Sequence, residues 1–139
     1  FVMLNPSRAD AALDDPTLRA CMQLAQRWNY ASLCVVNLFA YRTPHPTELK
    51  TAKNPIGQKN DAYVAKAAAR ADKVVLAWGN WGGLYERDRT ILSLLSPHQH
   101  KLTYLQLNRS GQPRHPLYVK RDQPLKPFSL NAAYPNGTH

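Results

Sequence analysis

Three polar side chains that can bind a ligand stand at the ends of apolar segments. Asn5 follows FVML, Asn37 follows LCVV, and His115 follows LTYLQL across a short glycine-containing turn. A carboxamide offers one acceptor and two donor hydrogens, and an imidazole can donate or accept. In open α/β domains, polar side chains at the carboxyl ends of strands converge on the crevice that binds ligands. We therefore expect these three side chains to share one site.

The elements that must position these side chains alternate between strand and helix. Continuous apolar runs predict buried strands, and apolar residues at helical spacing predict amphipathic helices. The predicted strands are 1–4, 33–39, 73–78 and 102–107, and the predicted helices are 16–28, 46–51, 61–71 and 84–95. This alternation is typical of βαβ units, so we predict a three-layer αβα domain with a mostly parallel central sheet of four or more strands.

Length and charge indicate one domain with an affinity for anions. The chain has 139 residues, of which 44% are hydrophobic, which fits a single domain over residues 1–139. We expect the tail after about residue 124 to dock loosely. Eighteen Lys and Arg against nine Asp and Glu give a net charge of +9. Such a charge favours nucleic acid as a partner, and a merely solvated basic surface is the alternative.

Cysteine and histidine usage argues against a disulfide framework or a metal site. Cys21 and Cys34 lie in apolar settings, so we expect reduced core residues in a cytoplasmic protein. No segment is long and apolar enough to span a membrane, and we expect no signal peptide. The remaining histidines show no metal-ligand spacing, so no metal or other cofactor is expected: His45, His98, His100 and His139.

The segments around these polar residues carry family resemblances. The blocks LNPS (4–7), DDPT (14–17), VVNLFAYR (35–42) and PRHPLYV (113–119) are similar to those of an uncharacterised bacterial domain family, over about residues 1–120. No activity can be transferred from that family. Together with VVLAWG (74–79), the same blocks in the same order resemble the landmarks of the uracil-DNA glycosylase superfamily, which implies a glycosylase-like fold.

The glycosylase resemblance implies a role for each matching residue. Asn5 would orient the attacking water, and Ser7 stands where strict uracil enzymes have an aromatic gate. Asn37 would read the edge of the extruded base, and His115 would donate to the base oxygen where negative charge develops. From the residues alone, Asn5 could instead cap a turn, Asn37 could make a structural hydrogen bond, and His115 could be an ordinary surface residue.

Neighbouring residues complete the expected site. Leu117 and Tyr118 could fill the gap that an extruded nucleotide leaves in a duplex. Aromatic rings near the crevice could contact a base, and basic groups or glycine amides could hold phosphates. The aromatic candidates are Phe39, Tyr41 and Trp81, and the phosphate candidates are Arg42, Arg114, Lys120, Arg121, Gly82 and Gly83.

The acidic cluster before the first predicted helix has a simpler interpretation. Asp15 precedes Pro16, which is suited to the first helical position, so Asp15 is predicted to cap the helix. Asp10 stays open as a group that could activate water.

Three functions fit these observations. The first is a DNA glycosylase-like enzyme that binds, and excises by N-glycosidic hydrolysis, a damaged or modified pyrimidine base. The second is a non-catalytic domain that binds nucleic acid or a nucleotide. The third is an N-glycosidase acting on free nucleosides or nucleotides. Fold alone does not choose between them.

Overall fold

The structure is a computed structural model that describes residues 1–6 and 15–130. Its strands are β1 (Val2–Met3), β2 (Val36–Asn37), β3 (Val74–Leu76), β4 (Leu102–Tyr104) and β5 (Lys126–Pro127). Its α-helices are α1 (Pro16–Arg27), α2 (Asn60–Arg70) and α3 (Arg87–Leu94), and its 3₁₀ helices are η1 (Pro46–Lys50), η2 (Asn80–Glu86), η3 (Ser96–Lys101) and η4 (Pro116–Tyr118).

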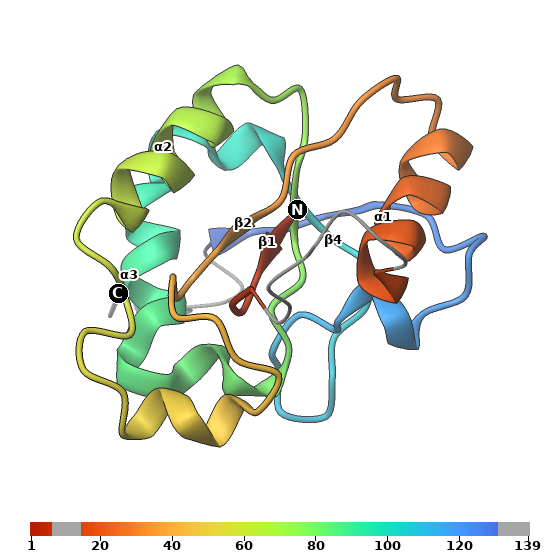
Figure 1. Cartoon of the computed structure of the whole chain (residues 1–139). Helices are drawn as coiled ribbons and strands as arrows, with labels where there is room; N and C mark the ends of the chain where they lie inside the picture. The colour runs from red at the N-terminus through yellow and green to blue at the C-terminus, as the bar shows by residue number, and fades with distance from the viewer. Residues whose placement is uncertain (7–14, 131–139) are drawn as a thin grey trace.

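The five strands form one mixed sheet in the order β2-β1-β3-β4-β5. The first four strands in this order are parallel, and β5 pairs antiparallel to β4. Figure 1 shows α1 on one side of the sheet and α2 with α3 on the other. The predicted three-layer α/β domain with a mostly parallel sheet is confirmed.

Strand alternation divides the core between the two faces of the sheet. Val74 and Leu76 pack with α2 and α3, whereas Val75 and Ala77 pack with Leu24 of α1. Because alternate side chains of a strand point to opposite faces, apolar runs such as VVLA need helices on both sides. The carboxyl ends of β1, β2 and β3 consequently lie at one edge, between the helical layers.

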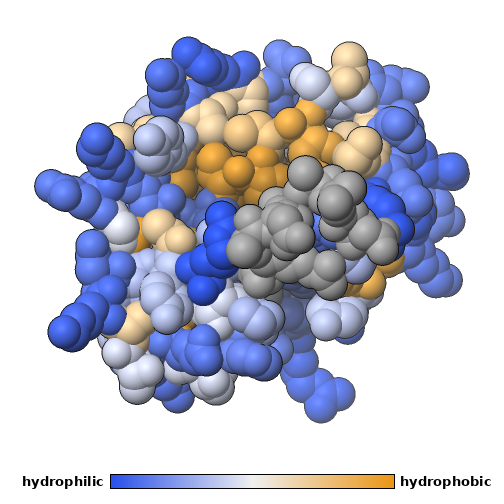
Figure 2. Space-filling model, viewed as in Figure 1, coloured by the Kyte–Doolittle hydropathy of each residue, from blue (hydrophilic) through white to orange (hydrophobic). Residues whose placement is uncertain are grey.

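The strand β2 differs from the prediction. The sequence predicts that residues 33–39 are buried on both faces, but β2 lies at the edge of the sheet, and Cys34 and Val35 are exposed. Apolar side chains gather around this strand on the face shown in Figure 2. The expectation that Cys34 is a core residue is therefore wrong, because no strand covers the outer side of this segment among the described residues. Cys21 is buried as expected.

Two later segments also depart from the prediction. The segment after residue 124 contributes the edge strand β5, and the buried Leu130 and the half-buried Phe128 join the core, so through residue 130 it docks more firmly than expected. The third long helix begins at Arg87 rather than at residue 84. Tyr85 and Glu86 both have left-handed backbone angles, and these end η2 before α3 starts.

Candidate functional site

A cleft of about 970 Å³ opens at the carboxyl ends of β1, β2 and β3. Asn5, Asn37 and His115 all line it, although they are far apart in the sequence. The crossovers of the parallel sheet bring the first two together, because β1 and β2 are neighbours. The loop that carries His115 is held beside β3 by a hydrogen bond from the Gly79 amide to the carbonyl oxygen of Pro113, at 2.8 Å.

The side chain of Asn5 fastens the wall of this cleft. Its Nδ2 lies 3.0 Å from the carbonyl oxygens of Pro6 and Tyr41 and 2.9 Å from that of Thr43. Three surrounding acceptors fix the orientation of the amide, because only its NH₂ group can donate to them. Its Oδ1 accepts no hydrogen bond from a described residue. Asn5 thus anchors the loop at residues 41–43, and its Oδ1 remains available as one weak hydrogen-bond acceptor.

The side chain of Asn37 is unbonded within the described residues. It is half-buried, and it lies on the α1 face of the sheet because it pairs in register with Met3. The end of β2 is held instead by side chains of other elements, which donate hydrogen bonds to its backbone carbonyl oxygens. The Nδ2 of Asn60 donates to the carbonyl oxygens of Asn37 and Leu38, at 2.8 and 3.1 Å.

A buried arginine completes this clamp on the end of β2. Arg87 is 2% exposed and donates through Nε and Nη2 to the carbonyl oxygen of Leu38, at 2.9 and 2.7 Å. Its Nη2 also lies 2.6 Å from Asp61, which supplies the opposite charge that a buried guanidinium needs. The backbone next to Asn37 is thus rigidly placed, while the Asn37 amide keeps its full hydrogen-bonding capacity.

His115 is held as a neutral donor. Its Nδ1 accepts a hydrogen bond from the Leu117 amide, at 3.1 Å, and so caps η4. Burial lowers the pKa of His115 below its usual 6.5, and this effect outweighs the opposing influence of the Asp15 carboxylate. At neutral pH the proton therefore resides on Nε2, because Nδ1 is used as an acceptor.

The cleft lining combines two arginines with one carboxylate among the described residues. Arg42 and Arg114 line the cleft and make no hydrogen bond or ion pair with any described side chain. Asp15 lines it too, and its Oδ1 accepts from the amides of Thr17 and Leu18, at 2.9 and 3.3 Å. The prediction that Asp15 caps α1 is confirmed, whereas Asp10 and Asp14 lie outside the described residues.

The rim of the cleft is apolar and aromatic. Leu117 and Tyr118 line the cleft and are 37% and 70% exposed. The Tyr118 ring lies 5.7 Å from the His115 ring, and Trp81 lines another part of the wall, with the Lys50 ammonium 5.1 Å from its ring centre. Exposed apolar side chains beside free guanidinium groups suit a ligand that has both ring faces and anionic groups.

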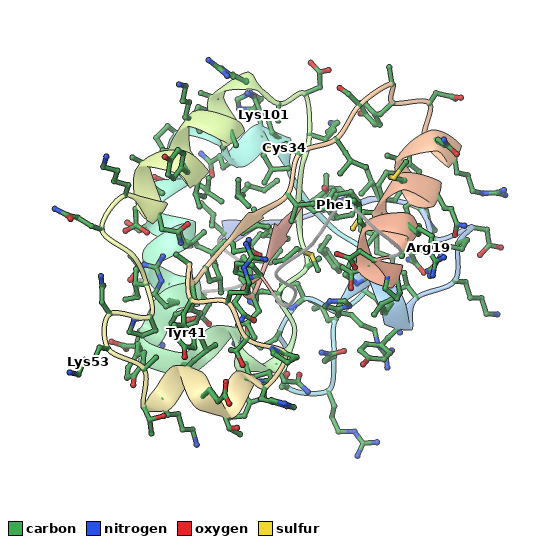
Figure 3. All side chains as sticks on the ribbon, viewed as in Figure 1. Phe1, Arg19, Cys34, Tyr41, Lys53 and Lys101 are labelled. Carbon is green, nitrogen blue, oxygen red and sulfur yellow. The ribbon has the colours of Figure 1, made fainter. Side chains whose placement is uncertain are left out.

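Several predicted contact residues lie elsewhere. Phe39 is fully buried in the core, where its ring meets Tyr85 edge-on, so it presents no surface to the cleft. Tyr41 does not line the cleft, and its side chain, labelled in Figure 3, is 40% exposed. Gly82 packs under Trp78, where an added Cβ would lie 2.0 Å from the indole ring. Its small size serves packing, and neither Gly82 nor Gly83 lines the cleft.

The two basic residues after η4 also lie outside the cleft. Arg121 donates to the Oε1 of Gln23 and to the carbonyl oxygens of Pro116 and Val119, so it ties the η4 turn to α1. Lys120 is exposed and does not line the cleft. Ser7 lies outside the described residues. Of the predicted positive groups, Arg42 and Arg114 are the ones at the cleft.

Sequence reasoning missed some lining residues whose position depends on long-range contacts. The Oδ1 of Asn80 accepts from Asn108 and Ser110, at 2.9 and 2.7 Å, and both asparagines line the cleft. Thr43 is buried beneath the wall, where its hydroxyl donates to Glu48. The signal in the sequence is the turn that directly follows the predicted strand 73–78, from which we predict ligand contacts only for Trp81, Gly82 and Gly83.

No cluster of three or more metal-binding side chains occurs in residues 1–6 and 15–130. Within the same residues, no helix is long and apolar enough to cross a membrane. What the site presents is a set of hydrogen-bonding, cationic and aromatic groups around an open cleft.

The fold and the cleft together define an α/β domain with an open crevice at the carboxyl edge of a mostly parallel sheet, the place where such domains commonly bind ligands. The family described as "Protein of unknown function (DUF1643)" matches residues 1–117, and the chain belongs to this family. Comparison with curated proteins gave no match, and comparison with solved structures gave none either.

Proposed function

We propose that the cleft binds a pyrimidine-type base extruded from a nucleic acid, DNA above all, and that the protein hydrolyses the N-glycosidic bond of that base. The observation that carries this proposal is that the unbonded Asn37 amide and the Nε2 donor of His115 line the same cleft. A uracil-type edge offers an N3–H donor and an O4 acceptor, which one carboxamide can pair with simultaneously. The remaining O2 oxygen would accept from His115.

The surroundings favour a base that is still attached to a strand. Arg42 and Arg114 would neutralise phosphates on either side of the extruded nucleotide. Leu117 and Tyr118 stand exposed at the rim, where they could occupy the space that the base vacates in the stack. The net charge of +9 adds long-range attraction to any polyanion.

Binding without hydrolysis is the second candidate, and the contacts of Asn5 favour it. An amide is too weak a base to take a proton from water, and the Nδ2 of Asn5 is already used by three carbonyls. Hydrolysis therefore requires a different proton acceptor.

The experiment measures binding and cleavage separately. Labelled single-stranded and duplex oligonucleotides carrying one uracil, a mismatched thymine or a 5-modified uracil are titrated by fluorescence anisotropy, and abasic sites are detected by alkaline strand cleavage. We expect the wild-type chain to bind the modified strand more tightly than the unmodified strand. Abasic product would establish the enzyme, and binding with no product would leave the second candidate.

Salt dependence tests the phosphate contacts. Arg114→Gln should lower the slope of log affinity against log salt by about one. Lys120→Gln removes the same charge from an exposed residue outside the cleft and is the matched control, with a smaller change expected. Equal effects of both substitutions would argue against the cleft as the nucleic-acid site. Hydrolysis of free mononucleotides without affinity for strands would instead indicate a nucleotide N-glycosidase.

A further inference from the structure

At the strand end where the glycosylase resemblance implies the water-positioning residue, this chain has Asn5, which carries no carboxylate. Among the described residues that line the cleft, the single carboxylate is Asp15, at the start of α1. It reaches the cleft from the helical layer rather than from the sheet. Capping the helix engages only one of the two oxygens of the Asp15 carboxylate.

The two carboxylate oxygens of Asp15 have different surroundings. Oδ1 accepts both capping hydrogen bonds, from the amides of Thr17 and Leu18. Oδ2 accepts no hydrogen bond from any described residue. The cap fixes the orientation of the side chain, and the second oxygen is left free to accept a proton.

Asp15 and His115 line the same cleft, and the charge of Asp15 influences the pKa of His115. The negative charge of Asp15 is the one influence that raises the pKa of His115 against the effect of burial. Both residues line the cleft with Asn37, so the proton acceptor, the proton donor and the base-reading amide surround one volume. Arg42 and Arg114 are the other charged groups of this lining.

We infer that Asp15 is the water-activating group of this cleft, and this inference rests on the hydrolytic form of the proposed function. Oδ2 accepts a proton from a water molecule whose oxygen attacks C1′ of the sugar. The bond from C1′ to the base nitrogen breaks, and its electron pair leaves with the base. Negative charge on the base O2 is stabilised by the Nε2–H of His115, and the proton on Asp15 passes to the released base through solvent. The products are an abasic sugar with a hydroxyl at C1′ and the free base.

Asp15→Asn separates the two roles of this side chain. An Asn side chain caps a helix about as well as an Asp side chain, so the thermal unfolding midpoint should stay close to the wild-type value. Loss of a general base typically costs about 10²–10⁴-fold in rate, so single-turnover excision should slow by that factor. The dissociation constant for the uracil oligonucleotide should change by less than about threefold.

Two further measurements guard against a structural explanation. Asp122→Asn makes the same substitution at an exposed site outside the cleft and should leave excision unchanged. The pKa of His115, followed by NMR titration, should fall in Asp15→Asn because the carboxylate that raises it is gone. If Asp15→Asn does not fold, Asp15→Ser preserves the cap by a different side chain and takes its place.

The outcomes are distinguishable. Slowed excision with unchanged affinity and unchanged unfolding supports the inference. Excision within threefold of wild type in the folded variant, or an unchanged His115 pKa, overturns it. A wild-type chain that binds the strand but forms no abasic site also overturns it, and leaves base binding standing. A chain that neither binds nor cleaves refutes the proposed function itself.

Discussion

The ends of β1 and β2 are neighbours in the sheet and carry the same residue type, but the two asparagines are used in opposite ways. At the end of β1, the Asn5 side chain makes three hydrogen bonds to backbone carbonyls. At the end of β2, Asn60 and Arg87 bond to backbone carbonyls, and the Asn37 side chain bonds to no described residue. The end of β1 is thus fixed by the side chain of its own Asn5, whereas the end of β2 is fixed by side chains from other elements that bond to its backbone.

The difference indicates that Asn5 has a structural role and that Asn37 is available to bind a ligand. The Asn37 amide is not a buried unsatisfied group, because its atoms are accessible from the cleft, so a ligand can bind it without breaking any hydrogen bond between described residues. Asn37 is therefore the better candidate for contact with a ligand, although its neighbour has the more conspicuous Asn-Pro motif. Substitutions at Asn5 and Asn37 test the contrast, and one at His115 tests the third polar residue of the cleft, in order of decreasing effect.

Asn5→Asp should have the largest effect, on stability. A carboxylate cannot donate, so the carbonyls of Pro6, Tyr41 and Thr43 would lose their donor and face a negative charge. We expect a loss of about 3 kcal/mol in the free energy of unfolding, measured by urea denaturation with tryptophan fluorescence. Asn37→Asp makes the same chemical change where no described partner exists, and should cost less than about 0.5 kcal/mol. Similar losses at both sites would remove the distinction.

Asn37→Ala should have an intermediate effect, confined to binding. Removing the amide takes away its hydrogen bonds to the base, and we expect the affinity for the uracil oligonucleotide to fall about tenfold, or about 1.4 kcal/mol. Anisotropy titration of the variant gives this number directly. The urea midpoint should match that of the wild type. A variant that unfolds more easily and binds as before would show that Asn37 is structural.

Apart from its role toward the base, His115→Asn should have the smallest effect, which is on the pH dependence of stability. Because the folded-state pKa of His115 lies below the unfolded value of 6.5, its contribution to stability is complete above pH 6.5 and is lost as the pH falls through the folded pKa. Asparagine keeps an acceptor for the Leu117 amide but does not titrate. Unfolding curves at several pH values between 5 and 7 should therefore show a weaker decline for the variant.

A matched histidine substitution checks that effect. His100 is exposed and lies outside the cleft, so His100→Asn should leave the decline below pH 6.5 as it is in the wild type. A decline that persists unchanged in His115→Asn would mean that another group controls it.

The sequence predicts the local parts of this fold well. The alternation of apolar runs and amphipathic segments gives the α/β architecture, and Asp15-Pro16 gives the start of α1. The short helix after His45 is also where the sequence predicts it, and only its last residue differs. These features depend on neighbours in the chain, which is why they can be deduced without tertiary structure.

The rest depends on pairing between distant segments. Nothing near residues 33–35 shows that β2 lies at an edge, so Cys34 was expected in the core. Phe39 and Tyr41 flank Ala40 in the same apolar block, yet Phe39 is fully buried, Tyr41 is 40% exposed, and neither lines the cleft. The guanidinium of Arg87 on Leu38 likewise has no signal in the sequence around either residue.

The first turn of α1 is also a wall of the cleft, since Asp15, Thr17 and Leu18 all line it. Helix ends open more readily than helix centres, and a ligand that binds only the closed form suppresses such opening by mass action. Occupancy of the cleft is thereby linked to amide hydrogen exchange at Thr17 and Leu18. The N-terminal turn of this helix can report a bound ligand even where no reaction follows.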